Sequence, residues 1–388
     1  MDTKKLLLIC GGIVGGFLIL LLVIWLISLS KPRYITYEAL EAKMVAASKN
    51  YVKDNESKFA NDNARYNLGY QTLVAGEYIK PIDELIEDYE KCSATVTIIK
   101  TDGEYSYVPY LNCGDKYTTV ELYKQILNDN KTVTSGSGLY RDANGTYYFK
   151  GKNLNNYVAF GSMEKRNKMV DNIWQIISIS NDHTVKLRAT FAINDTKTQW
   201  DDRYNVTEDK YVGYNLFDDS IIQEVLTNTY EKKYILNEEQ RSKLVPRRLC
   251  VAPRAVEDTS KDGSTECSVL SKKYYYFSTL TPYEILRISP DENCKDMSSY
   301  SCSNFNYLSQ NSQSEEWLIT SAIGTDYQAW AFDGFSFNPV KTKNTKNLYL
   351  VVELNEYSFY KTGDGSLENP YRLKLSSETK ETEEKTEK

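Results

Sequence analysis

The chain has 388 residues, a formal net charge of −6 at pH 7 and 26% charged residues. This acidic balance argues against nucleic-acid binding, which depends on positive charge meeting phosphates. The length allows two soluble domains. The excess of Tyr, 32 against 12 Phe, favours strands with hydrated surfaces, because a Tyr ring packs while its hydroxyl stays solvated.

The first element is an unbroken apolar run from Leu6 to Leu29, which contains no charge. A helix of about 24 residues is about 36 Å long, enough to cross a bilayer core of about 30 Å. The run predicts one transmembrane helix over residues 6–30, with residues 1–5 in the cytoplasm and the soluble part extracellular. The alternative is a cleaved signal peptide, which has a shorter apolar region and a small-residue exit that only Ser28-Leu29-Ser30 could supply. We therefore expect a single-pass protein of the cell membrane, with this run as its contact to the membrane.

An amphipathic helix is expected next, from Thr36 to Phe59. Its apolar residues recur at helical spacing with Lys and Glu on the opposite face, and they are Leu40, Met44, Ala47 and Tyr51. After it we expect a polar break over Asn61–Asn67 and short helices over Tyr70–Ala75 and Asp83–Tyr89.

A hairpin with a disulfide is expected at the end of this region. Strand-like runs over Thr95–Lys100 and Tyr105–Leu111 flank Asp102-Gly103, a strong two-residue hairpin signal. In that register, facing residues have numbers that sum to 205, and Cys92 and Cys113 meet this condition. The pair also falls on the non-hydrogen-bonded alternation, where Cα atoms come closest. We therefore predict a Cys92–Cys113 disulfide.

Four more cysteines lie beyond this hairpin. An even number in an exported chain indicates disulfides, although six cysteines allow fifteen pairings. Proximity favours Cys250–Cys267 and Cys294–Cys302. A metal site lacks support, because no C-x-x-C occurs and the chain has one His. These bridges would place the soluble part outside the cytoplasm.

The layout of residues 34–125 resembles pilins and pseudopilins. An apolar helix continues into an amphipathic one, and Leu73–Pro81 reads Leu-Val-x-x-x-Tyr-Ile-Lys-Pro before the hairpin. The resemblance implies a small domain of one helix and an antiparallel sheet. Pilins carry Glu just inside the apolar helix, and nothing between Leu6 and Leu29 matches it, so assembly into a pilus is in doubt. Residues 126–138, which end in Ser-Gly-Ser-Gly, are expected to form a linker.

Residues 139–375 are expected to form a β-rich domain, followed by a disordered acidic tail over 376–388. A hairpin is expected between Ile173–Ile179 and Val185–Arg188, and Asn237 is expected to cap a helix. The other expected elements are strands at Tyr147–Phe149, Tyr274–Leu280, Trp317–Thr320, Ala329–Phe332 and Leu348–Leu354, and helices at Ser220–Tyr230 and Pro282–Leu286.

Six segments of this domain follow one another in a characteristic order. They are Ile173–Ile177, Ser220–Leu226, Tyr276–Glu284, Glu316–Ser321, Leu350–Leu354 and Thr362–Tyr371. Together they resemble a family of bacterial extracellular domains of unknown function that is common in Gram-positive surface proteins. Ile319 stands where the family has Arg, and Leu350-Val351 stand where it has Arg-Pro, which indicates a divergent member.

The Trp-containing end also resembles C-type-lectin-like and sulfatase-modifying-factor layouts. Lectin calcium sites need Glu-Pro-Asn or Gln-Pro-Asp, and neither tripeptide occurs, so the resemblance implies a fold and no activity. The expected fold class is α+β: one transmembrane helix, a small pilin-like domain, and a β-rich α+β domain with a C-type-lectin-like layout.

No catalytic, cofactor-binding or metal-binding motif is recognised. His183 lacks the G-x-S-x-G elbow of a catalytic triad, and no P-loop, dinucleotide fingerprint or H-E-x-x-H occurs. Asp201-Asp202 and Asp218-Asp219 lack the spaced oxygen ligands of a calcium loop, so solvated loops are favoured. Arg247-Arg248 could meet an acidic partner such as teichoic acid, but a solvated turn is favoured.

The candidate ligand-binding residues are Trp200 and Tyr204. Trp200 is followed by Asp201-Asp202-Arg203, and this polar company predicts an exposed ring. By contrast, Trp174 and Trp330 lie within apolar strands and are expected in the core. If the domain binds glycans, Trp200 with Tyr204 is the expected stacking platform.

The sequence therefore predicts a membrane-anchored extracellular surface protein that binds or adheres to cell wall, to a glycan or to another surface protein. A binding module is favoured over an enzyme, and no cofactor is expected. Two alternatives stay open. One is a pseudopilin-like component of an export or competence apparatus, and the other is a surface hydrolase of glycans, which would show a cleft lined by convergent carboxylates.

Overall fold

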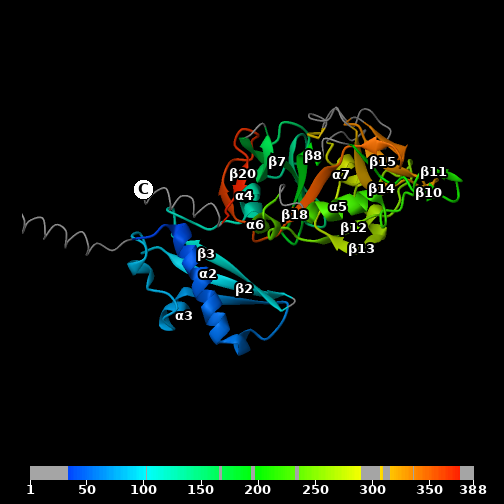
Figure 1. Cartoon of the computed structure of the whole chain (residues 1–388). Helices are drawn as coiled ribbons and strands as arrows, with labels where there is room; N and C mark the ends of the chain where they lie inside the picture. Colours follow the sequence, from blue (N-terminus) through cyan, green and yellow to red (C-terminus); the bar gives the residue numbers. More distant parts are fainter. Residues whose placement is uncertain are drawn as a thin grey trace, which may run out of the picture. The chain divides into compact units, whose positions relative to one another are not determined.

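The computed structural model describes residues 34–101, 103–165, 168–193, 197–231, 236–289, 306–308, 315–334 and 336–375. It is a mixed α+β structure whose elements are drawn in Figure 1. The chain divides into two compact units, Met1–Thr119 and Val120–Lys388.

The first unit contains an antiparallel sheet in the order β1-β2-β3, with helix α2 packed against it (Figure 1). Helix α2 begins after Thr36, whose hydroxyl accepts the N–H of Ala39. Leu40 and Met44 on its inner face share one hydrophobic core with Val96 of the sheet. The elements are α2 Tyr37–Asp54, β1 Ala64–Gly69, α3 Tyr70–Ala75, β2 Ser93–Thr101 and β3 Glu104–Asn112, with 3-10 helices at Glu56–Phe59 and Ile82–Glu84.

The hairpin of β2 and β3 has the register that the sequence predicts. Val96 faces Pro109, and the outermost pair is Ser93 with Asn112. The predicted disulfide between Cys92 and Cys113 follows directly, with the two Cα atoms 3.9 Å apart. It closes the open end of the hairpin.

The second unit is built on an eight-stranded sheet. Its continuous path is β18-β8-β7-β6-β20-β19, while β5 pairs with both β7 and β4. A three-stranded sheet β14-β15-β16 and the strand pairs β12-β13, β10-β11 and β9-β17 complete the described strands. The strands are β4 Gly138–Arg141, β5 Tyr147–Lys150, β6 Tyr157–Lys165, β7 Lys168–Ile179, β8 Val185–Ala192, β9 Thr198–Gln199, β10 Tyr204–Asn205, β11 Lys210–Tyr211, β12 Arg247–Cys250, β13 Leu270–Tyr275, β14 Glu316–Ser321, β15 Gln328–Phe332, β16 Phe337–Lys341, β17 Thr345–Lys346, β18 Tyr349–Leu354, β19 Tyr360–Thr362 and β20 Tyr371–Leu373. The helices are α4 Leu122–Asp129, α5 Ile221–Glu231, α6 Glu238–Arg241 and α7 Pro282–Arg287, with a 3-10 helix at Glu266–Ser268.

One hydrophobic core serves this whole unit. It contains four fully buried Trp side chains, Trp174, Trp200, Trp317 and Trp330. Helix α4 belongs to it, because Leu122 and Ile126 are buried there. The boundary between the units therefore falls after Thr119 and not after residue 125, and the expected linker over 126–138 includes the end of α4 and the start of β4.

The expected transmembrane architecture requires a correction. No helix in the described part of the chain is long and apolar enough to cross a membrane. The run from Leu6 to Leu29, on which the transmembrane helix and the membrane contact were expected, lies outside the described residues. The described residues form a mixed α+β structure, and we do not retain the predicted single-pass location at the cell membrane.

Candidate binding groove

A groove of about 440 Å³ opens on the surface of the second unit. This volume lies within the range of about 300–1,000 Å³ that is common for ligand sites. Three walls from distant parts of the sequence enclose it. They are residues 215–219, residues 321–326, and a third wall of Val251, Pro253, Val269 and Lys272.

Asn215 holds the first wall to the second. Its backbone N–H donates to the carbonyl oxygen of Asp326 at 2.8 Å. Its side-chain amide lies 3.1, 2.8 and 2.9 Å from the carbonyl oxygens of Ala322, Thr325 and Gln328, which share its two hydrogens. The side chain is buried, so this amide holds three carbonyl oxygens of the second wall and its continuation away from water.

Arg254 holds the second wall to the third. Its N–H donates to the carbonyl oxygen of Ser321 at 2.9 Å, and its own carbonyl accepts the N–H of Ile323 at 3.0 Å. Its buried guanidinium donates to the carboxylate of Glu266 at 2.7 Å and to the carbonyl of Ser260 at 2.7 Å. Burial raises the pKa of Glu266, and the charge of Arg254 opposes that rise. The pair fixes the loop behind the third wall.

The third wall is fastened by a disulfide between Cys250 and Cys267. Next to it, the N–H of Val251 donates to the carbonyl oxygen of Val269 at 3.0 Å. The ring of walls closes where the N–H of Lys272 approaches a carboxylate oxygen of Asp218 at 3.4 Å. The three walls of the groove are therefore bonded to one another.

Apolar side chains dominate the groove surface. Leu216 is 66% exposed, Ile323 56% and Val269 52%, while Phe217 and Ala322 are buried beneath them. A single exposed apolar residue is ordinary, but three from separate segments around one hollow mark an interaction surface. Charged groups lie in the same lining, namely Asp218, Asp219, Asp326 and Lys272.

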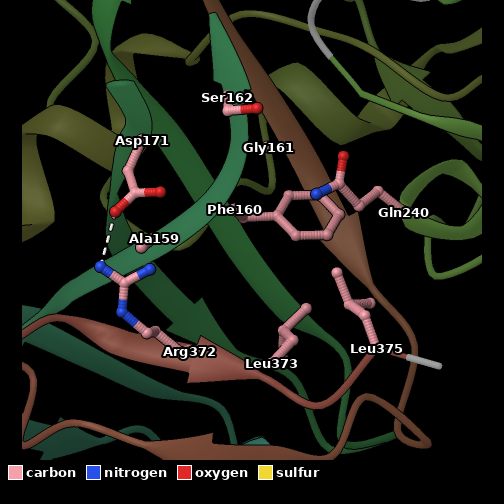
Figure 2. A pocket seen from close by; sticks show the side chains of 9 residues that line it. All are labelled: Ala159, Phe160, Gly161, Ser162, Asp171, Gln240, Arg372, Leu373 and Leu375. Carbon is pink, nitrogen blue, oxygen red and sulfur yellow. Dashed lines mark hydrogen bonds and ion pairs between the residues drawn. The ribbon is translucent and has the colours of Figure 1, made fainter. Parts of the chain in front are cut away.

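A smaller hollow of about 100 Å³ lies where β6, β7 and β20 meet (Figure 2). Phe160 and Gly161 form an irregularity in β6 there, and Arg372 and Asp171 point toward one another as an ion pair 2.5 Å apart. Its volume is below that of a ligand pocket and suits a few waters. The larger groove is therefore the candidate binding site.

The structure separates the two predicted ligand-binding residues. The Trp200 side chain is fully buried and packs edge-to-face against Trp317, with ring centroids 5.8 Å apart. The expectation of an exposed Trp200 is wrong: its ring fills the core, and the neighbouring Asp201 is buried too, where it pairs with Arg203. Tyr204 is 42% exposed on β10, where its ring meets that of Tyr211 across the hairpin at 5.2 Å.

Charged residues of two other motifs form ion pairs within the second unit. Asp201 is buried and pairs with Arg203, and Arg247 pairs with both Glu353 and Asp182. His183 lies in the turn between β7 and β8 and stacks on the ring of Tyr123. Among the described residues, no group of three His, Cys, Asp or Glu side chains is placed to hold a metal ion.

Two of the three expected disulfides lie in the described part of the chain, and both are formed. Cys294 and Cys302 lie outside it. Disulfides persist in oxidising compartments, so the two bridges are consistent with an extracellular protein.

No protein-family model, curated protein or solved structure matches this chain. The groove residues were also missed by the sequence analysis. Leu216, Val269 and Ile323 lie in short apolar pairs with no helical or strand periodicity, and Asp218-Asp219 were interpreted only as solvated carboxylates. The one local signal was the proximity of Cys250 and Cys267, which marked the loop that becomes the third wall.

Proposed function

We propose that the second unit is a protein-binding module of an extracellular compartment, and that its groove accepts an apolar side chain of a partner polypeptide. The observation that carries this proposal is the exposure of Leu216, Val269 and Ile323 around a buried floor. Burying such side chains against a partner is worth about 1.5–3 kcal/mol for each one fully covered. Anchors of this kind, seated in pockets, supply most of the affinity of protein interfaces.

A polypeptide fits this groove better than a glycan does. Sugar rings bind by stacking on exposed aromatic faces, and the one aromatic residue of the lining, Phe217, is buried. The walls are aliphatic, and their exposed side chains would cover one side of a ligand without enclosing it. This arrangement suits a side chain that projects from a larger partner.

Binding without turnover is supported by the same lining. Four lining residues are buried: Phe217 and Ala322 are apolar, the amide of Asn215 is bound to three carbonyl oxygens, and Ser321 carries a hydroxyl. Among the described residues that line the groove there is no His to activate that hydroxyl. The carboxylates of the lining are less buried than those four residues, and Asp219 is exposed to solvent. Catalytic acids and bases are commonly tuned by burial, which this position does not provide.

The test is selection of binders to the whole chain from a random-peptide display library. Selected peptides are then measured by fluorescence anisotropy against the unmodified protein, Ile323→Ser and Met169→Ser. Met169 is the matched control, because it is also a strongly exposed apolar residue but does not line the groove. Mass spectrometry after incubation shows whether each peptide stays intact.

We expect the selected peptides to share an apolar residue. Ile323→Ser should weaken binding about tenfold or more, and Met169→Ser should leave it unchanged. Selected peptides that bind Ile323→Ser as tightly as the unmodified protein would overturn the proposal. Cleavage of the peptides would replace simple binding with a peptidase activity, which differs from the glycan hydrolase that the sequence left open.

A further inference from the structure

We propose that the partner segment places a Lys or Arg next to the apolar residue that enters the groove. This inference rests on the proposed function and names the chemistry of the partner. It follows from the charges in the groove lining, where the carboxylates of Asp218, Asp219 and Asp326 stand against the single ammonium of Lys272. The lining thus has a formal charge of −2 around an apolar floor.

These three carboxylates are not neutralised within the described structure. None of them forms an ion pair with a described Lys or Arg, although the chain has many such pairs elsewhere. The charge of Asp219 helps to raise the pKa of Arg203, but the guanidinium of Arg203 donates its hydrogen bonds to both carboxylate oxygens of Asp201. Asp218 accepts only the backbone N–H of Lys272, at 3.4 Å.

The acidic groups also come from two different walls. Asp218 and Asp219 belong to the first wall, and Asp326 belongs to the loop that Asn215 holds in place. A cationic side chain flanking the anchor on either side would therefore meet a carboxylate. An Asp or Glu beside the apolar residue of the partner would be repelled by these carboxylates. The lining therefore disfavours acidic neighbours and favours basic ones.

The contribution of each rim pair is modest and depends on salt. Exposed ion pairs change affinity only about two- to fivefold each, and they weaken as the Debye length falls from about 10 Å at 0.1 M salt to about 3 Å at 1 M. The apolar anchor is not weakened in this way. The apolar contribution and the charge contribution to binding can therefore be measured separately.

The test compares two baits in the same random-peptide display selection at about 0.1 M salt, where screening is moderate. One bait is the charge-neutralised Asp218→Asn/Asp326→Asn protein. The other is Asp115→Asn/Asp202→Asn, which loses the same number of charges at exposed positions outside the groove. Peptides selected by each bait are sequenced, and one apolar-basic peptide is measured against both by fluorescence anisotropy.

We expect the Asp115→Asn/Asp202→Asn bait to enrich Lys or Arg within a few positions of the apolar residue. The groove-neutralised bait should lose that enrichment, keep the apolar residue, and bind the measured peptide about five- to tenfold more weakly. Apolar peptides with no basic enrichment, or equal enrichment by both baits, would overturn this inference and leave the proposed function standing. If neither bait enriches apolar residues, the proposed function itself fails.

Discussion

The backbone N–H of Val251 donates to the carbonyl oxygen of Val269 at 3.0 Å, and both side chains line the groove. Cys250 directly precedes Val251, and Cys267 lies two residues before Val269. A covalent bond and a hydrogen bond therefore fasten the same wall. The two bonds act on positions only one or two residues apart on each segment of the wall.

Replacing both cysteines, as Cys250→Ser/Cys267→Ser, should destabilise the second unit and weaken peptide binding. The cross-link closes a loop of 17 residues, and a loop of about this length corresponds to about 3 kcal/mol of unfolding free energy. Urea unfolding measures the stability loss, and anisotropy with a groove-binding peptide measures the effect on the wall. The matched control is Cys92→Ser/Cys113→Ser, which removes the bridge of the first unit. It should leave peptide binding unchanged, and equal weakening by both variants would contradict the assignment of the groove.

Alanine substitutions at two glycines near the groove should distinguish the cost of backbone strain from the cost of a steric clash. Gly213 has φ +75°, and a Cβ there would lie 2.2 Å from the carbonyl oxygen of Asp201. Gly324 has φ +101° with no atom within 4 Å of such a Cβ. Gly324→Ala should therefore cost only about 1–2 kcal/mol, whereas Gly213→Ala should cost more, about 3 kcal/mol or above. Thermal unfolding of the two variants checks the order, and equal losses would show that the segment at Gly213 can move aside.

Local sequence signals predicted the elements whose strand register or helix cap is determined by residues close in sequence. The Cys92–Cys113 hairpin is one, because its turn and its pairing sum agree. Helix α3 spans the predicted Tyr70–Ala75, and Asn237 caps α6 in a capping box with Gln240. Each of these depends on contacts between residues close in sequence, which one sequence displays directly.

Some elements defined by distant partners were not predicted, although the strand expected at Leu348–Leu354 is present as β18. Strand β1 occupies much of the expected polar break over Asn61–Asn67, because pairing with β2 satisfies its backbone and buries Leu68. The expected helix over Asp83–Tyr89 is reduced to a 3-10 turn at Ile82–Glu84. The groove is the extreme case, since its first and second walls are more than 100 residues apart in sequence and no local pattern indicates that they meet.

Acid should destabilise the second unit partly through Asp182. Burial acts to raise the pKa of this carboxyl, but hydrogen bonds from Arg247 and Thr184 outweigh it and hold the pKa below its usual value. A carboxyl with a lowered folded pKa stabilises the fold above its unfolded pKa of about 3.9, and this stabilisation is lost as the pH falls through the folded value.

The measurement is the difference in urea unfolding free energy between the unmodified protein and Asp182→Asn, between about pH 6 and pH 3. The difference should be largest at the upper end and shrink toward the lower end. Asp202→Asn, an exposed carboxylate nearby in the same unit, is the control for the general loss of charge. A difference that stays constant with pH would mean that Asp182 does not contribute through its ionised form.

The last prediction concerns the two residues that the sequence had joined as a glycan platform. Trp200→Ala should cost about 3–5 kcal/mol of unfolding free energy, because it empties a fully buried site against Trp317. Tyr204→Ala should change stability by about 0.5 kcal/mol, since its ring is partly exposed on a two-stranded hairpin. Near-ultraviolet circular dichroism and urea unfolding measure both effects.

The Trp200 variant should also weaken peptide binding without any contact between that ring and the peptide. The carbonyl oxygen of Trp200 accepts the N–H of Ile222 at 3.3 Å, near the start of α5, and Asp218 and Asp219 of the first wall come just before that helix. Losing the ring would therefore loosen the support of this wall. If Trp200→Ala proved as stable as Tyr204→Ala and lost only binding, Trp200 would be a surface contact after all and the buried placement would be refuted.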